Sequence, residues 1–263
     1  MLLEKGSIDM VLVPSGLVLM FGYHLILLYR VLRFPHTTVI GFENHNKKAW
    51  VERMLRGGAS EASLALSVVA ANISTSTTLA SLSLALCSFI GAWVGNSSKV
   101  LLPEMIYGDR SLSTNSVKYI ALVGCFLLAF TSLVQAARYY VHASFLITTM
   151  DSDIPVGYVQ KAVIRGGNFF TVGLRLQYLA ATLLLWVFGP IPMLASSLVI
   201  VITLGIFDNN TTPLHHFRYD HFSGKEGKAP ATAVNQATHA SSSNVDNILN
   251  HPLIYAAPST MSS

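Results

Sequence analysis

The stretch Met10–Tyr29, MVLVPSGLVLMFGYHLILLY, contains 20 residues and no charged side chain. At a rise of about 1.5 Å per residue, a helix of this length covers the roughly 30 Å hydrocarbon core of a bilayer. A secretory signal usually has a shorter apolar region that ends in a small-residue cleavage site, and this stretch has neither feature. We therefore interpret it as a retained membrane-spanning helix.

The composition of the whole chain agrees with a membrane protein. Of its 263 residues, 52% are hydrophobic and only 11% are charged, whereas about 25% of the residues of a soluble domain are charged. The formal net charge of +4 is spread along the chain. A nucleic-acid-binding protein gathers its basic residues on one face, so we predict no nucleic-acid partner.

Three further apolar stretches follow, because residues 62–98, 119–137 and 176–207 also carry no charge. Each is long enough for one crossing of a bilayer. The sequence therefore predicts an all-α, polytopic membrane helical bundle of about four transmembrane helices in a domain of residues 1–222. The predicted spans cover about residues 8–29, 74–95, 119–141 and 178–207.

The last predicted span contains two prolines, Pro190 and Pro192. A proline has no amide hydrogen, so the carbonyls of Trp186 and Phe188 would lose their helical donors. This pattern predicts a helix kink near the middle of the span.

Four crossings place both termini on one side of the membrane. The loops after the first and third spans hold ten of the 17 basic residues, and the remaining seven lie on the other side. Because basic residues concentrate on the cytosolic side, the count predicts non-cytosolic termini. The membrane itself is either the plasma membrane or an endomembrane.

Thr131, Gln135, Arg138 and His142 follow one another at steps of four, three and four residues, so they share one face of the third span. In one interpretation this polar stripe walls a polar cavity, where Arg138 attracts an anion and His142 takes up a proton. In the other, Gln135 joins two helices by hydrogen bonds, and Arg138 and His142 mark the membrane surface.

The segment Phe42–Arg56, in the loop after the first span, predicts a short basic amphipathic helix. We expect it to lie in the membrane interface, with Trp50 as an anchor and its basic residues near anionic lipid headgroups. A docking surface for another protein is the alternative. The residues assigned to the interfacial helix are Lys47, Lys48, Trp50 and Arg53.

Residues 223–263 are rich in Ser, Thr, Asn and Ala and have no apolar period, which predicts a disordered polar C-terminal tail. Before it, His215, His216, Asp220 and His221 combine metal-binding residue types, but their spacing matches no strong zinc pattern. We predict no metal site and no cofactor. The usual nucleophile, metalloprotease, phosphate-loop and kinase signatures do not occur, so we predict no catalytic residues and no enzymatic activity.

Three stretches carry a resemblance to a known family: PHTTVIG at 35–41 leading into KAWVERM at 48–54, the Ser/Thr-rich run that begins at Asn72, and FGPIPM at 188–193. Over roughly residues 8–222 the chain resembles the plant branch of a membrane family known as domain of unknown function number 599. The resemblance implies a four-span membrane protein of higher plants. It implies no substrate and no catalytic residue.

Two functional hypotheses follow. The polar stripe and the predicted kink favour a small transporter or channel-type subunit. The basic loop helix and the polar tail favour the alternative, a non-catalytic membrane scaffold or regulatory partner protein. Four helices enclose little space, so a pore would require a homo-oligomer or other membrane proteins.

Overall fold

The computed structural model describes residues 5–96, 112–149 and 155–212. These residues are almost entirely helical, which confirms the all-α prediction. One short 3-10 helix, η1, joins the first two α-helices. The elements are α1 (Lys5–Arg33), η1 (Pro35–Thr37), α2 (Val39–Arg56), α3 (Ala59–Asn96), α4 (Leu112–Thr148), α5 (Val156–Phe188) and α6 (Pro190–Phe207).

Five described helices, α1, α3, α4, α5 and α6, are long and apolar enough to cross a membrane. This finding supports an integral membrane protein, and the number of candidate spans among the described residues is five, close to the predicted four. The first three predicted spans lie within α1, α3 and α4. The fourth, 178–207, is divided between the end of α5 and the whole of α6.

The division falls at Gly189, where the chain turns between α5 and α6. Gly189 has φ 147° and ψ 169°, a region open to glycine and closed to residues with a Cβ. Its N–H donates to the Trp186 carbonyl at 3.1 Å. Pro190 and Pro192 lie in the first turn of α6. Backbone N–H groups there have no acceptor within the helix, so a proline removes no hydrogen bond. The predicted kink in one continuous helix is therefore wrong, because the chain reverses direction.

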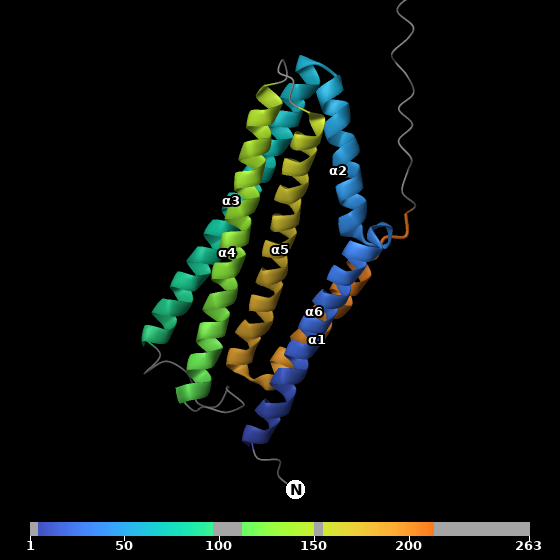
Figure 1. The fold of residues 1–263 in the computed structure, drawn as a ribbon. Helices are drawn as coiled ribbons and strands as arrows, with labels where there is room; N and C mark the ends of the chain where they lie inside the picture. The colour runs from blue at the N-terminus through green and yellow to red at the C-terminus, as the bar shows by residue number, and fades with distance from the viewer. Residues whose placement is uncertain (1–4, 97–111, 150–154, 213–263) are drawn as a thin grey trace, which may run out of the picture. The chain divides into compact units, whose positions relative to one another are not determined.

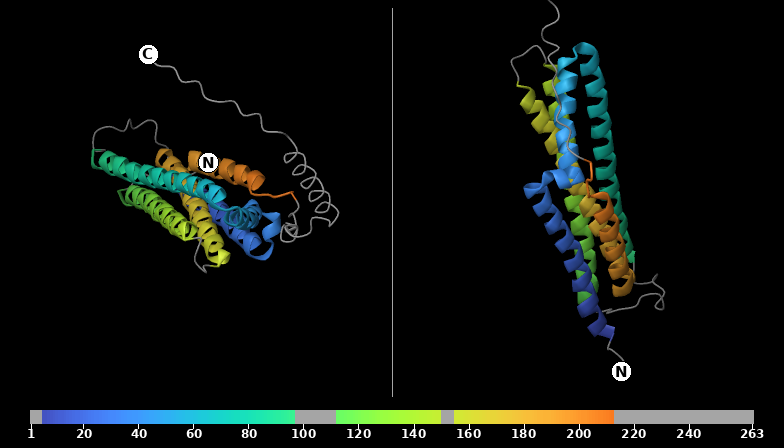
Figure 2. Two further views of the ribbon diagram at one scale, coloured as in Figure 1. Left: turned by 90° about the horizontal axis from the view of Figure 1, so that it is seen from above. Right: turned by 90° about the vertical axis from the view of Figure 1, so that its right-hand side faces the viewer.

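The helices pack as neighbours in a simple order (Figures 1 and 2). α4 packs against both α3 and α5, α6 packs against α5, and α1 packs along α6. α1 and α6 run in the same direction, because a Cβ built on Gly16 meets Ser197 and Arg30 bonds to Asn209. The start of α1 and the end of α6 therefore lie at opposite ends of this pair. The prediction that both termini share a side depends on an even number of crossings, and its outcome stays a prediction.

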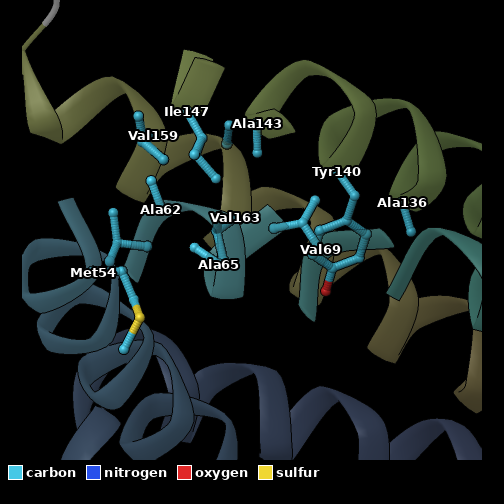
Figure 3. Close-up of a cluster of buried hydrophobic side chains, with 12 residues drawn as sticks. Met54, Ala62, Ala65, Val69, Ala136, Tyr140, Ala143, Ile147, Val159 and Val163 are labelled. Atoms are coloured by element: carbon cyan, nitrogen blue, oxygen red, sulfur yellow. The ribbon is translucent and has the colours of Figure 1, made fainter. Parts of the chain in front are cut away.

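Two apolar clusters fill the described bundle. The first, which we call the α2 cluster, joins α2 to the first half of α3, the second half of α4 and the first half of α5 (Figure 3). The second, the α6 cluster, includes Val13, Leu122, Leu183, Trp186 and Met193. α3, α4 and α5 have 38, 37 and 33 residues, so they measure about 50–57 Å. They exceed the thickness of a bilayer's hydrocarbon core, and α2 packs at one end of them, which we call the α2 end.

Candidate functional site

A buried ion pair joins α5 to the end of α6. Arg175 Nη2 donates to Asp208 Oδ1, and the side chains of the two residues are 15% and 7% exposed. The hydroxyl of Tyr23 on α1 donates to the other carboxylate oxygen at 2.5 Å. Three helices therefore meet at one carboxylate.

The turn at Gly189 explains how these residues meet. Arg175 and Asp208 are 33 residues apart, so a continuous straight helix would separate them by about 50 Å. Because α6 folds back along α5, the two charges that bracket the apolar stretch 176–207 become partners. In the sequence the two residues are only the limits of that stretch. Their opposite charges allow a pair, but the pairing depends on the turn at Gly189.

The same end of α6 is fastened to η1 through the backbone. Val39 N–H donates to the Asp208 carbonyl at 3.0 Å, and Asn210 N–H donates to the Thr37 carbonyl at 3.1 Å. Arg30 binds both segments: its Nη1 donates to Asn209 Oδ1 at 2.8 Å, and its Nη2 donates to the Thr37 carbonyl at 3.0 Å. We call the set of Tyr23, Arg30, Arg175, Asp208 and Asn209 the clasp.

Two clefts flank Arg175. The first, which we call the α1 cleft, lies between α1, α5 and the start of α2 and has a volume of about 470 Å³. The second, the α6 cleft, lies between α2, α5 and α6 and has a volume of about 600 Å³. Ile40, Thr171 and Arg175 line both clefts. Arg175 therefore lies between the two clefts.

Two polar atoms at the α1 cleft have no hydrogen-bond partner among the described residues: Arg175 Nη1 and His24 Nε2. His24 Nδ1 donates to the Met20 carbonyl of its own helix at 2.7 Å. In the neutral ring this bond places the proton on Nδ1, so Nε2 is an acceptor. Both residues line the α1 cleft, but the two atoms are themselves closed to solvent, and the rest of the lining is largely apolar.

The polar stripe predicted on the third span lies on the outer face of α4. Thr131, Arg138 and His142 are exposed and Gln135 is half-buried, whereas Leu133, Ala136 and Tyr140 on the opposite face are buried. The Thr131 hydroxyl donates to the Leu127 carbonyl at 2.9 Å, within its own helix. Among the described residues, the stripe lines neither of the two clefts.

A different glutamine joins two helices. Gln177 Nε2 on α5 donates to Ser83 Oγ on α3 at 2.9 Å. Sequence reasoning missed this contact because Gln177 follows Arg175 closely and was placed at the edge of a span.

The predicted interfacial helix is α2, but protein covers its apolar face. Val51 and Met54 are buried in the α2 cluster, and Trp50 packs against it. Two polar contacts show that α2 runs antiparallel to α5: Asn44 with Asn168 at 3.0 Å, and Gln160 with the Lys48 carbonyl at 3.1 Å. The apolar face is therefore not available to lipid as predicted, because its partners are α3 and α5.

Two of the three assigned basic side chains of α2 are exposed, whereas Lys47 lies against Gly167 of α5. Lys48 and Arg53 are exposed, and Lys47 pairs with Glu43 at 3.0 Å. Their contact with anionic lipid headgroups stays a prediction. Three predictions fall outside the described residues. They concern the histidine-rich set at 215–221, the domain limit at residue 222 and the tail at 223–263.

A comparison with known protein families identifies the family of this chain. The model of a family described as a protein of unknown function, DUF599, matches residues 11–213. The chain belongs to the DUF599 family. The DUF599 match includes every residue of the clasp and both clefts, and it ends before the tail. No curated protein and no solved structure matches the chain.

Proposed function

We propose that this DUF599 protein is a non-catalytic, multi-pass membrane protein that binds a small amphiphilic ligand beside Arg175 and acts as a carrier. The observation that carries the proposal is the position of Arg175, nearly buried between two clefts among helices of membrane-spanning length. Charged side chains inside a membrane are expensive and usually mark the path of a ligand or ion.

The packing of the described helices favours a carrier over a channel subunit. The two apolar clusters fill the spaces between the helices, and the polar stripe on α4 faces outward. The clefts, in contrast, open beside exposed apolar residues such as Phe21 and Leu32 on α1. A ligand would therefore enter from the side, out of the bilayer.

A carrier of this kind requires α1 and α6 to move against α3–α5. The pair is connected to α5 by the turn at Gly189, by the apolar contacts of the α6 cluster and, at the other end, by the bond between Arg175 and Asp208. Rigid-body rocking of such a pair opens or closes the clefts beside it, as in other membrane carriers.

The distribution of the basic residues favours one orientation of a protein with five crossings in the membrane. With five crossings, the segment after α1, the segment between α4 and α5 and the segment after α6 share a side. Without Arg175, which lies among the helices, these segments and the adjoining helix ends hold twelve basic residues, and the other side holds four. This asymmetry is much larger than ten against seven. By the positive-inside rule, the α2 end and the C-terminus are cytosolic and the N-terminus is not.

Obstruction of the α1 cleft tests the proposal. Leu28 lines this cleft and Leu25 does not, although both are exposed leucines on α1. We expect the wild type and Leu25→Trp, purified in detergent, to retain about one small amphiphile per chain in mass spectra of solvent extracts. Leu28→Trp should reduce that amount at least tenfold. Equal amounts in all three proteins would contradict a ligand site in this cleft.

A further inference from the structure

A guanidinium and two stacked aromatic rings lie together at the outer surface of α4 and α5. The rings of Tyr139 and Phe169 are stacked, with their centroids 5.5 Å apart and an angle of 17° between their planes. Arg165 Cζ lies 5.9 Å from the centroid of the Tyr139 ring, which is within the range of a cation–π contact. None of the three residues lines the α1 cleft or the α6 cleft. We call this set the aromatic stack, and it is separate from both clefts.

The surface around the aromatic stack carries positive charge and no counter-charge from its own helices. Neither α4 nor α5 contains an acidic residue. Arg138 on α4 and Lys161 and Arg165 on α5 are exposed. Within the described part of the chain, the ion pairs join other residues, so none of these three cations has an acidic partner. Lys161 and Arg165 are four residues apart, so they lie one turn apart on the same helix face. This surface is therefore complementary to an anion.

The exposed face of α5 changes from basic to apolar at the aromatic stack. Lys161, Arg165, Phe169 and Val172 follow one another at steps of four, four and three residues, so they share this face. Phe169 and Val172 are 36% and 49% exposed. The face is thus basic toward the α2 end and apolar toward the Gly189 turn. Such a change is typical of a helix that leaves the hydrocarbon core of a bilayer and enters the headgroup region.

The neighbouring helices change at the same level. On α4, the exposed residue Val134 lies one turn before Arg138. On α1, Leu32 is 73% exposed and is followed by the exposed Arg33 at the end of the helix. Leu32 lines the α1 cleft together with Asn168 of α5, which places the end of α1 beside the same part of α5. Three helices therefore place the lipid headgroups beside the aromatic stack, where the phosphate of an anionic lipid is the complementary group.

We infer that the outer surface of α4 and α5 binds one anionic glycerophospholipid, with its phosphate at Arg165 and Lys161 and an acyl chain along Phe169 and Val172. Arginine suits this role because its guanidinium bonds two phosphate oxygens and also stacks on aromatic rings. In the orientation proposed above the α2 end is cytosolic, and the cytosolic leaflet is rich in anionic lipids. The inference goes beyond the proposed carrier function, because this site needs no ligand in the α1 cleft.

Native mass spectrometry of lipid binding tests the charge of the ligand. The full chain in a neutral detergent is titrated with dioleoyl phosphatidylglycerol or with dioleoyl phosphatidylcholine, which has the same chains and no net charge. We expect one saturable phosphatidylglycerol per chain, with a dissociation constant about tenfold lower than that of phosphatidylcholine. Absence of saturable binding, or equal affinity for the two lipids, overturns the inference. Displacement by sodium phosphate, beyond the effect of sodium chloride at the same ionic strength, overturns it as well, because the ligand would then be a soluble anion.

A matched pair of arginine variants tests the position of the site. Arg165→Gln and Arg53→Gln each remove one exposed guanidinium, but Arg53 lies on α2 and has no ring contact within the described part of the chain. We expect Arg165→Gln to weaken phosphatidylglycerol binding about tenfold and Arg53→Gln to bind like the wild type. Equal losses in the two variants would mean attraction by net charge without a site. Leu28→Trp, which obstructs the α1 cleft, should also bind like the wild type, and loss of the lipid there would place it in that cleft.

Two variants of Tyr139 test the aromatic stack. Tyr139→Phe keeps the ring between Arg165 and Phe169, whereas Tyr139→Leu removes it. We expect Tyr139→Phe to bind phosphatidylglycerol like the wild type and Tyr139→Leu to bind it more weakly, because the guanidinium loses the ring that holds it in place. The melting temperature of both variants shows that the compared proteins are folded. If Tyr139→Leu is folded and binds as tightly as Tyr139→Phe, the inference is overturned.

Discussion

Asp208 connects more elements than any other residue of the clasp. Its carboxylate accepts from Arg175 and Tyr23, its carbonyl accepts from Val39 N–H, and its own N–H donates to the Leu204 carbonyl at 2.8 Å. Removal of one partner from a buried ion pair leaves an uncompensated charge, which destabilises proteins by about 3–5 kcal/mol. We therefore expect Asp208→Leu to lower the melting temperature of the detergent-solubilised protein sharply, as followed by tryptophan fluorescence.

The control for this prediction removes both charges. In Arg175→Met combined with Asp208→Leu, apolar side chains replace the pair and no charge stays buried, so most of the lost stability should return. A single variant that melts like the wild type, or a double variant that melts at or below the single one, would contradict the role of the pair. Sequence patterns identified both charges, but their pairing depends on a turn between them.

At the scale of the elements, two glycines of α5, Gly166 and Gly173, lie against side chains of α4. A Cβ built on Gly173 would lie 2.6 Å from Leu133 Cγ, and Leu133 is fully buried. We expect Gly173→Ala to push the two helices apart and to destabilise the protein by about 1–3 kcal/mol, as overpacking commonly does. The measurement is the change in melting temperature.

Gly157 on the same helix provides the matched control. A Cβ built there meets nothing within 4 Å, so Gly157→Ala should leave packing unchanged and stabilise α5 by up to about 1 kcal/mol through helix propensity. If Gly173→Ala and Gly157→Ala shift the melting temperature alike, close packing at Gly173 does not hold α4 and α5 together.

The elements differ in how far the sequence could predict them. α1, α3 and α4 were found because each contains at least 18 uncharged residues, and lipid tolerates little else. The first half of α5 was assigned to a loop, because Lys161, Arg165 and Arg175 interrupt its apolar pattern. The sequence prediction joined α6 to the end of α5 in one continuous span. Proline is compatible both with a kink inside a helix and with the first turn of a new helix, and only the conformation of Gly189 distinguishes the two.

The candidate site could be predicted less well than the fold. A periodic stripe such as Thr131 to His142 identifies a shared helix face, but it does not say whether that face is turned inward. The α1 cleft is lined by α1, the start of α2 and α5, which are distant in the chain. His24 and Arg175 line the same cleft although they are 151 positions apart in the chain.

For the whole molecule, the central claim is that the turn at Gly189 gives five crossings and thereby brings Arg175 to Asp208 beside the clefts. The most direct test is the sidedness of the two ends in intact microsomes. A glycosylation acceptor on an N-terminal extension should be modified, and one on an extension after Ser263 should stay unmodified and be cut by added protease. Modification of both ends, or protease access to both, would mean an even number of crossings and would contradict the account.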